Sequence, residues 1–168
     1  MTYHTLAYLG AILHPVICET WNVRLSRKRF IAGSVKPDRS SLFVRHPHFW
    51  GHSHAFVIRR IRKLSRRSLD PAKKNKRFSE DLGIVLHYVA DFFTAAHNVK
   101  PNRLREHIAY EAALHEEFLA GVSTASVRNT LRLLGSTSPD AGASAEKLLC
   151  ELHARYWPSM SLPSADTR

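Results

Sequence analysis

Apolar residues recur at the spacing of an α-helix along most of this chain, and the alternating patterns typical of strands are scarce. In the last predicted helix the apolar positions share one face; they are Leu148, Leu149, Leu152 and Tyr156. The pattern predicts helices over residues 2–19, 24–32, 56–65, 82–96, 124–134 and 143–157, and a further helix around His107. We therefore expect an all-α fold, a helical bundle of about six to seven helices.

The length of 168 residues suits a single domain, which we place at residues 1–157, with a frayed tail over residues 158–168. Neither an internal repeat nor a linker interrupts it. Two cysteines, Cys18 and Cys150, are too few for a disulfide framework, and without a CxxC spacing they exclude a cysteine-rich structural zinc site. Histidine is frequent, with 11 residues, and directs attention to metal binding or acid–base chemistry.

Two pairs of imidazole and carboxylate side chains fall four residues apart within residues 82–111. His87 and Asp91 lie in a predicted helix that is otherwise apolar, and residues at this spacing share one helix face. His107 and Glu111 repeat the spacing in the next predicted helix, and His97 lies between the two helices. A buried carboxylate without a partner costs on the order of several kcal/mol, so such a cluster is usually paired or bound to metal. Two antiparallel helices joined by a short loop could aim all five side chains into one space.

Other candidate ligands lie nearer the start of the chain. His4 falls in the first turn of the first predicted helix, where it is either a ligand or a half-exposed terminal histidine. Asp38 follows a proline in an irregular turn, and its carboxylate serves either a metal ion or an Asx-turn or helix N-cap. A histidine-rich segment follows, from which we expect one ligand. Its four histidines are His46, His48, His52 and His54.

The net charge of +11 is concentrated in one segment. From Arg59 to Arg77 the chain carries ten basic residues against Asp70 alone, so this segment holds +9. A patch this local disfavours a protein that coats nucleic acid generally. It is either a solvated loop or a surface that attracts an anionic membrane.

The apolar runs of the chain are short. None reaches about 18 residues, so no transmembrane helix is expected. The run over residues 6–13 lacks the basic flank and the cleavage site of a signal peptide. We therefore expect a cytoplasmic protein, either unattached or peripheral at the inner membrane surface.

The joint pattern of ligand residues resembles the prokaryotic zinc-dependent phospholipase C family. HxxxD at His87 and Asp91, His97 six residues on, and HxxxE at His107 and Glu111 carry the resemblance. GSVKPD and PHF precede them, and the resemblance covers residues 2–111. It implies an all-α bundle around a multinuclear zinc site. It also implies a phosphodiester substrate, for which phospholipid is the first choice.

The resemblance also implies which residues bind each zinc ion. One ion would be bound by Asp38, His48, His87 and Asp91, with His46 or His52 as the alternative to His48. A second would be bound by His97, His107 and Glu111, and a third by His4 with Asp91. Secreted members also use the amino group and carbonyl of an N-terminal tryptophan, whereas this chain begins with Met1. Two or three zinc ions are therefore expected, and Asp38 would orient or deprotonate the attacking water.

Three functions are compatible with this sequence. The first is a zinc-dependent phosphodiester hydrolase of the phospholipase C type, in which zinc lowers the pKa of bound water to ~7 and polarises the phosphoryl group. The second is a nuclease of the same superfamily, with the basic segment holding a phosphate backbone. That segment lacks the interleaved aromatic residues of a base-stacking platform, which favours lipid over nucleic acid. The third is a non-catalytic metal-binding helical domain.

Three aromatic residues have two possible roles. Trp50, Phe92 and Phe93 line a substrate pocket or pack in the core.

Overall fold

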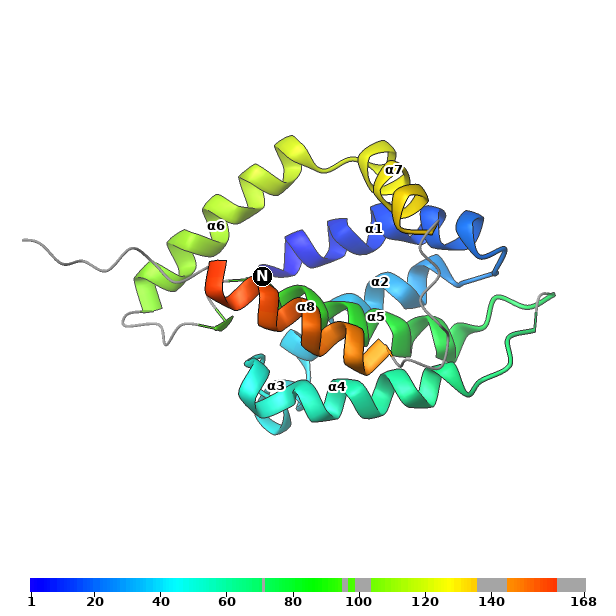
Figure 1. Ribbon diagram of the computed structural model, residues 1–168, viewed down its shortest axis with the longest axis horizontal. Coiled ribbons are helices and arrows are strands. Elements are labelled where there is room, and N and C mark those ends of the chain that lie inside the picture. Colours follow the sequence, from blue (N-terminus) through cyan, green and yellow to red (C-terminus); the bar gives the residue numbers. More distant parts are fainter. Residues whose placement is uncertain (71, 95–96, 99–103, 136–144, 160–168) are drawn as a thin grey trace, which may run out of the picture.

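The computed structural model consists of helices and connecting loops, and the all-α prediction is confirmed (Figure 1). It describes residues 1–70, 72–94, 97–98, 104–135 and 145–159, and no strand occurs among them. None of the described helices is long and apolar enough to cross a membrane. The helices are α1 (Tyr3–Thr20), α2 (Arg27–Val35), α3 (Leu42–Arg45), α4 (Trp50–Ser65), α5 (Lys76–Phe92), α6 (Leu104–Gly121), α7 (Thr124–Gly135) and α8 (Ala145–Ser159), with the 3-10 turn η1 (Pro37–Arg39) between α2 and α3.

Two helices begin earlier than the sequence pattern predicts. α4 begins at Trp50 rather than Phe56, so it includes the last two histidines of the histidine-rich segment. α5 begins at Lys76 and ends at Phe92, so the end of the basic segment is helical rather than part of an exposed connection. Apolar periodicity could not reveal these first turns, because their residues are largely polar. The predicted tail lies mostly outside the described residues, because the structure describes none of residues 160–168.

The closest packing in the fold brings α2 and α5 together backbone to backbone. A Cβ atom on Gly83 of α5 would lie 2.2 Å from the carbonyl oxygen of Phe30. A Cβ atom on Gly33 of α2 would lie 2.2 Å from the carbonyl oxygen of Glu80. Real Cβ atoms essentially never come within 3.0 Å of another heavy atom, so only glycine fits at both positions. The crossing fixes α2, and the η1 turn that follows it, against the middle of α5.

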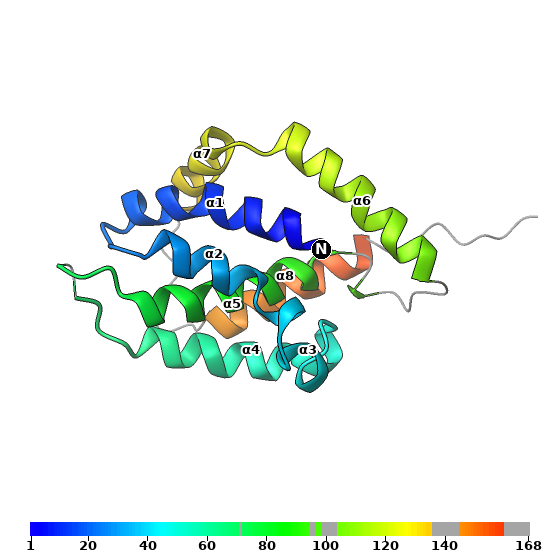
Figure 2. The same ribbon diagram turned by 180° about the vertical axis from the view of Figure 1, so that it is seen from behind.

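Helices α1, α4 and α8 cover this pair of helices from two sides. α1 packs on α2, α4 packs along α5, and α8 lies against α4 (Figures 1 and 2). The main core lies between α4, α5 and α8, where Tyr88 and Phe92 of α5 are completely buried. Trp50 and Phe93 are partly buried and pack against the same core, so both residues serve packing.

Helix α8 is held against α4 by an aromatic stack. The ring of His153 lies parallel to Trp50, with centroids 3.7 Å apart, and His54 stacks on Trp50 at 5.3 Å. His153 Nε2 donates a hydrogen bond to Asn98 Oδ1 at 3.1 Å. Burial lowers the pKa of His153, and the nearby charge of His54 lowers it further. The neutral form of His153 is therefore the one that the folded protein favours.

We expect Gly83→Ala to destabilise the fold by about 3 kcal/mol, because the added methyl group meets backbone that can move only by separating the two helices. Gly51→Ala is the matched control. Its added Cβ meets nothing within 4 Å, so its stability should stay within about 1 kcal/mol of the original chain. Urea unfolding of both variants in chelator measures the difference. Equal midpoints would show that the crossing does not need glycine.

Acid should weaken the attachment of α8. The pKa of His153 is lower in the folded chain than its ordinary value of 6.5. The contribution of neutral His153 to stability is therefore complete above pH 6.5 and falls as the pH drops below that value. We expect hydrogen-exchange protection factors in α8 to be severalfold lower at pH 5 than at pH 8. The same change of pH should lower the protection factors in α2 less. His153→Phe keeps a stacking ring without a titrating group and should remove most of this pH dependence. An unchanged dependence in that variant would assign it to another group.

Candidate metal centre

Imidazoles and carboxylates from distant parts of the chain meet beside the end of α5. Two groups of three have ligand atoms within 4.8 Å of one another. The first group is Asp38, His48 and His87, and the second is His48, Asp91 and His97. These two groups thus join one helix, the η1 turn and two loops.

Asp91 is the centre of the arrangement, since its two oxygens face different neighbours. Oδ2 lies 3.1 Å from His48 Nδ1 and 3.2 Å from His87 Nε2. Asp38 Oδ1 lies 3.5 Å from each of the same two ring nitrogens. These four side chains are the set that the family resemblance assigned to one zinc ion.

A hydrogen bond on the side of the ring away from the carboxylates fixes the orientation of His87. Its Nδ1 donates a hydrogen bond of 2.8 Å to the carbonyl oxygen of Ser34, in the last turn of α2. The other nitrogen, Nε2, therefore points at the two carboxylates, in the orientation of a metal-binding imidazole whose far nitrogen is held by a carbonyl. The α2–α5 crossing supplies this carbonyl and thereby sets the direction of the ring.

A second set of side chains meets on the other side of Asp91. Oδ1 of Asp91 lies 3.4 Å from His97 Nε2, which lies 3.6 Å from Glu111 Oε1 of α6. The amino group of Met1 lies among them, 2.5 Å from Asp91 Oδ1, 3.0 Å from Glu111 Oε1 and 3.2 Å from His97 Nε2. Asp91 therefore belongs to both sets.

The ionisation of these groups shows how strongly the site attracts positive charge. Burial raises the pKa of Asp91, but the imidazoles of His48 and His87 and the amino group of Met1 hold it well below its ordinary value. Burial lowers the pKa of His87, yet the adjacent Asp91 raises it above its ordinary value. Burial raises the pKa of Asp38 despite the same two imidazoles. The carboxylates thus favour cationic neighbours.

The residues fit a metal ion on three grounds. Asp91 Oδ2 is buried, and among the described residues no donor meets it with the geometry of a hydrogen bond. The ammonium group of Met1 already acts as a cation between two carboxylates. Imidazole nitrogen and carboxylate oxygen together are ligands that zinc accepts. Zinc is therefore the metal that the ligand types and the family resemblance both indicate.

The structure also places the other predicted ligands. His48 is buried beside Asp91, whereas the ring of His46 stacks on Phe56 with centroids 3.8 Å apart and His52 is exposed. The geometry thus favours His48 among the histidines of this segment. His4 is exposed in the first turn of α1 and belongs to neither group, so its role stays a prediction. The side chain of His107 lies outside the described residues.

Met1 is the residue of the centre that the sequence reasoning did not assign. Its side chain is buried with Leu6 and Val35, which holds its amino group at the cluster. Thr2 caps α1 by accepting a hydrogen bond from the backbone N–H of Thr5 at 3.1 Å, which directs the first residue toward the end of α5. Secreted family members use their N-terminal residue as a zinc ligand, and this was the one signal that could have pointed to Met1.

The geometry defines a helical protein with a candidate multinuclear metal centre. Residues 1–133 match the model of the family described as zinc dependent phospholipase C. This match spans most of the chain, and the chain belongs to the zinc-dependent phospholipase C family. No curated protein and no solved structure is significantly similar to it.

We expect His48→Ala to lower the zinc content of the purified protein by about one ion, because the imidazole that faces both Asp38 and Asp91 is lost. His46→Ala, two residues away, should leave the zinc content unchanged, because its ring stacks on Phe56. Elemental analysis of protein purified without a histidine tag measures both. If only the His46 variant lost zinc, His46 rather than His48 would be the ligand.

Proposed function

We propose that this protein is a zinc-dependent phosphodiester hydrolase of the phospholipase C type. The observation that carries the proposal is the pair of ligand sets that share Asp91. Two adjacent metal ions can hold two oxygens of one phosphoryl group, which is how binuclear centres cleave phosphodiesters. Membership of the family supports phospholipid as the substrate class.

The proposed centre binds two zinc ions. Asp38, His48, His87 and Asp91 are the proposed ligands of one ion. His97, His107 and Glu111 are the proposed ligands of the other, together with the second oxygen of Asp91. A third ion bound by His4 with Asp91 stays a prediction, as does the cytoplasmic location. When bound, zinc supplies a Lewis acid for the phosphoryl oxygens and lowers the pKa of water.

Asp38 is the proposed base. Its side chain is 27% exposed, whereas those of His48, His87 and Asp91 are between 0% and 6% exposed, so water and substrate reach this carboxylate first. It sits in the η1 turn, held beside the two imidazoles by the packing of α2. Burial raises its pKa, which makes the carboxylate a better acceptor of the proton of an attacking water.

We expect Asp38→Asn to reduce kcat on phosphatidylcholine by about 100-fold or more, because the amide keeps an oxygen but cannot accept a proton. Asp70→Asn, in the connection between α4 and α5, is the control and should keep full activity. Release of phosphorylated head group measures the reaction in zinc-loaded protein, with and without chelator.

The same preparations distinguish the alternatives. Cleavage of single-stranded DNA without cleavage of lipid would assign the protein to the nuclease branch of the superfamily. Zinc-loaded protein that cleaves neither substrate would contradict the proposal and leave a non-catalytic metal-binding domain.

A further inference from the structure

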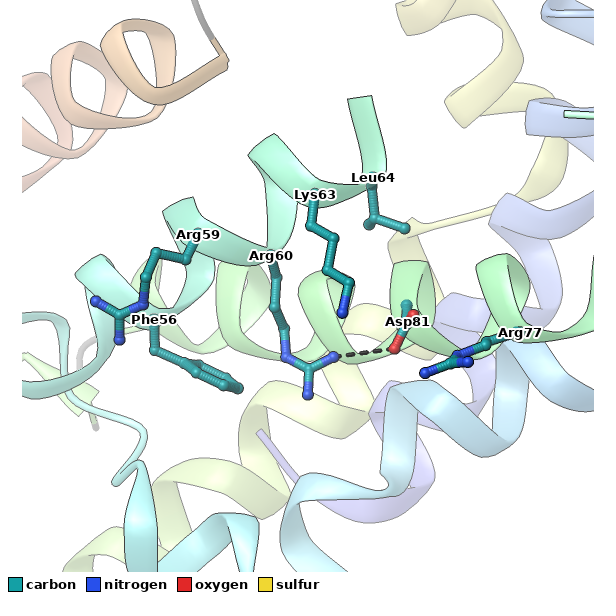
Figure 3. Close-up of a pocket in the computed structure, with 7 residues that line it drawn as sticks. All are labelled: Phe56, Arg59, Arg60, Lys63, Leu64, Arg77 and Asp81. Atoms are coloured by element: carbon teal, nitrogen blue, oxygen red, sulfur yellow. Dashed lines mark hydrogen bonds and ion pairs between the residues drawn. The ribbon is translucent and has the colours of Figure 1, made fainter. Parts of the chain in front are cut away.

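A basic cleft lies between α4 and α5, away from the metal centre. It encloses about 340 Å³ and is open to solvent (Figure 3). Its lining residues are Phe56, Arg59, Arg60, Lys63, Leu64, Arg77 and Asp81. Asp81 lies six residues before His87 and ten before Asp91 on α5, so the cleft is about 9 to 15 Å along the helix from these two proposed ligands.

The cleft continues onto the neighbouring face of α2. A second hollow of about 450 Å³ shares Arg77 and Asp81 with the first and adds Arg29, Lys36, Lys76 and Glu80. We call the lining of both hollows the basic strip. Its charged residues are seven cations and two carboxylates. The strip therefore carries a large excess of positive charge on one face.

The two carboxylates are committed to particular cations. Asp81 binds Arg60 at 3.0 Å and also Arg67, at the edge of the strip, at 2.9 Å. Glu80 binds Arg29 at 3.0 Å and Lys36 at 2.5 Å. Four further cations of the strip have no carboxylate within salt-bridge distance among the described residues. They are Arg59, Lys63, Lys76 and Arg77.

The aromatic residue of the strip is not available for stacking on a nucleic-acid base. His46 covers Phe56 with its ring parallel at 3.8 Å, and the guanidinium of Arg60 lies over the Phe56 ring at 4.8 Å. Single-stranded nucleic acid is held by open aromatic faces as well as by positive charge. The strip offers charge alone, which suits a surface of phosphate groups rather than exposed bases.

We propose that the basic strip is a docking surface for the anionic phospholipids of a membrane. Clusters of four to eight basic residues on a helix face bind anionic bilayers through the summed attraction of their charges. Arg59, Lys63, Lys76 and Arg77 supply such a cluster, and Asp81 holds Arg60 and Arg67 in place beside it. The inference adds a binding surface, distinct from the metal centre, to the proposed function and does not depend on catalysis.

Vesicle sedimentation tests the docking surface directly. The zinc-loaded full chain is mixed with vesicles of phosphatidylcholine alone or with about one third phosphatidylglycerol, at about 0.1 M and 0.5 M salt. Lys63→Glu with Arg77→Glu reverses two charges that make no described ion pair. Lys147→Glu with Arg155→Glu makes the same change in net charge on α8, which lies on the other side of the α4–α5 pair from α2 (Figures 1 and 2).

We expect the original chain to prefer the anionic vesicles and to lose that preference at high salt. The strip variant should bind them at least tenfold more weakly, since each basic residue near an anionic surface contributes about fivefold. The α8 variant should retain at least half of the original affinity. Circular dichroism confirms that both variants are folded, and Lys63→Gln with Arg77→Gln replaces the strip variant if it is not.

Three results would overturn the proposal. These are equal binding to both kinds of vesicle, equal loss in the strip and α8 variants, and strong binding to duplex DNA without vesicle binding. Hydrolysis of a soluble short-chain phosphatidylcholine is measured separately. Loss of vesicle binding with retained hydrolysis, or the reverse, distinguishes failure of the docking surface from failure of the proposed function.

Discussion

The backbone contact between α2 and α5 is the constraint on which the candidate centre depends. Gly33 and Gly83 let the helices approach until any other side chain would collide with backbone. This approach puts the carbonyl of Ser34 within hydrogen-bond distance of His87 and brings Asp38, in the η1 turn, to the same place. Two ligands on separate elements thus obtain their positions from the packing of two glycines.

Asp91 is the second constraint, because it is completely buried and negatively charged. A charge in such a place is tolerated only where cations or strong hydrogen-bond donors surround it. His48, His87, His97 and the amino group of Met1 fill that role from four directions. The chain therefore folds around a carboxylate whose stabilisation depends on partners that can also bind a metal ion.

The sequence predicted the fold class, and it predicted that His87 and Asp91 lie side by side on one helix. Apolar periodicity indicates helices regardless of tertiary contacts, and the spacing of His87 and Asp91 places both on one face of α5 in any helix. The loop ligands are different. Asp38 and His48 could be assigned only through the family resemblance, because no rule of spacing says which residue of an irregular segment meets a distant helix.

Met1 and the exact starts of α4 and α5 escaped prediction for related reasons. The position of a terminal amino group depends on the packing of its neighbours, here the side chain of Met1 against Leu6 and Val35. The first turns of α4 and α5 are polar, so hydrophobic periodicity gives no signal there. Local rules therefore locate helices and ligand pairs, whereas tertiary packing decides which distant groups join them.

The two ligand sets differ in how they are built, and this has a consequence for the order of metal binding. Asp38, His48 and His87 rest on the closely packed α2–α5 pair and the segments beside it. Glu111 comes from α6, where no described side chain is fully buried and where the partly buried Leu114 and Phe118 pack on the cluster of Met1, Leu6 and Val35. A preorganised set spends less free energy on ordering its ligands. In the proposed centre we therefore expect the first set to bind zinc at a lower concentration, and an ion bound by the second set would add a link between α6 and α5.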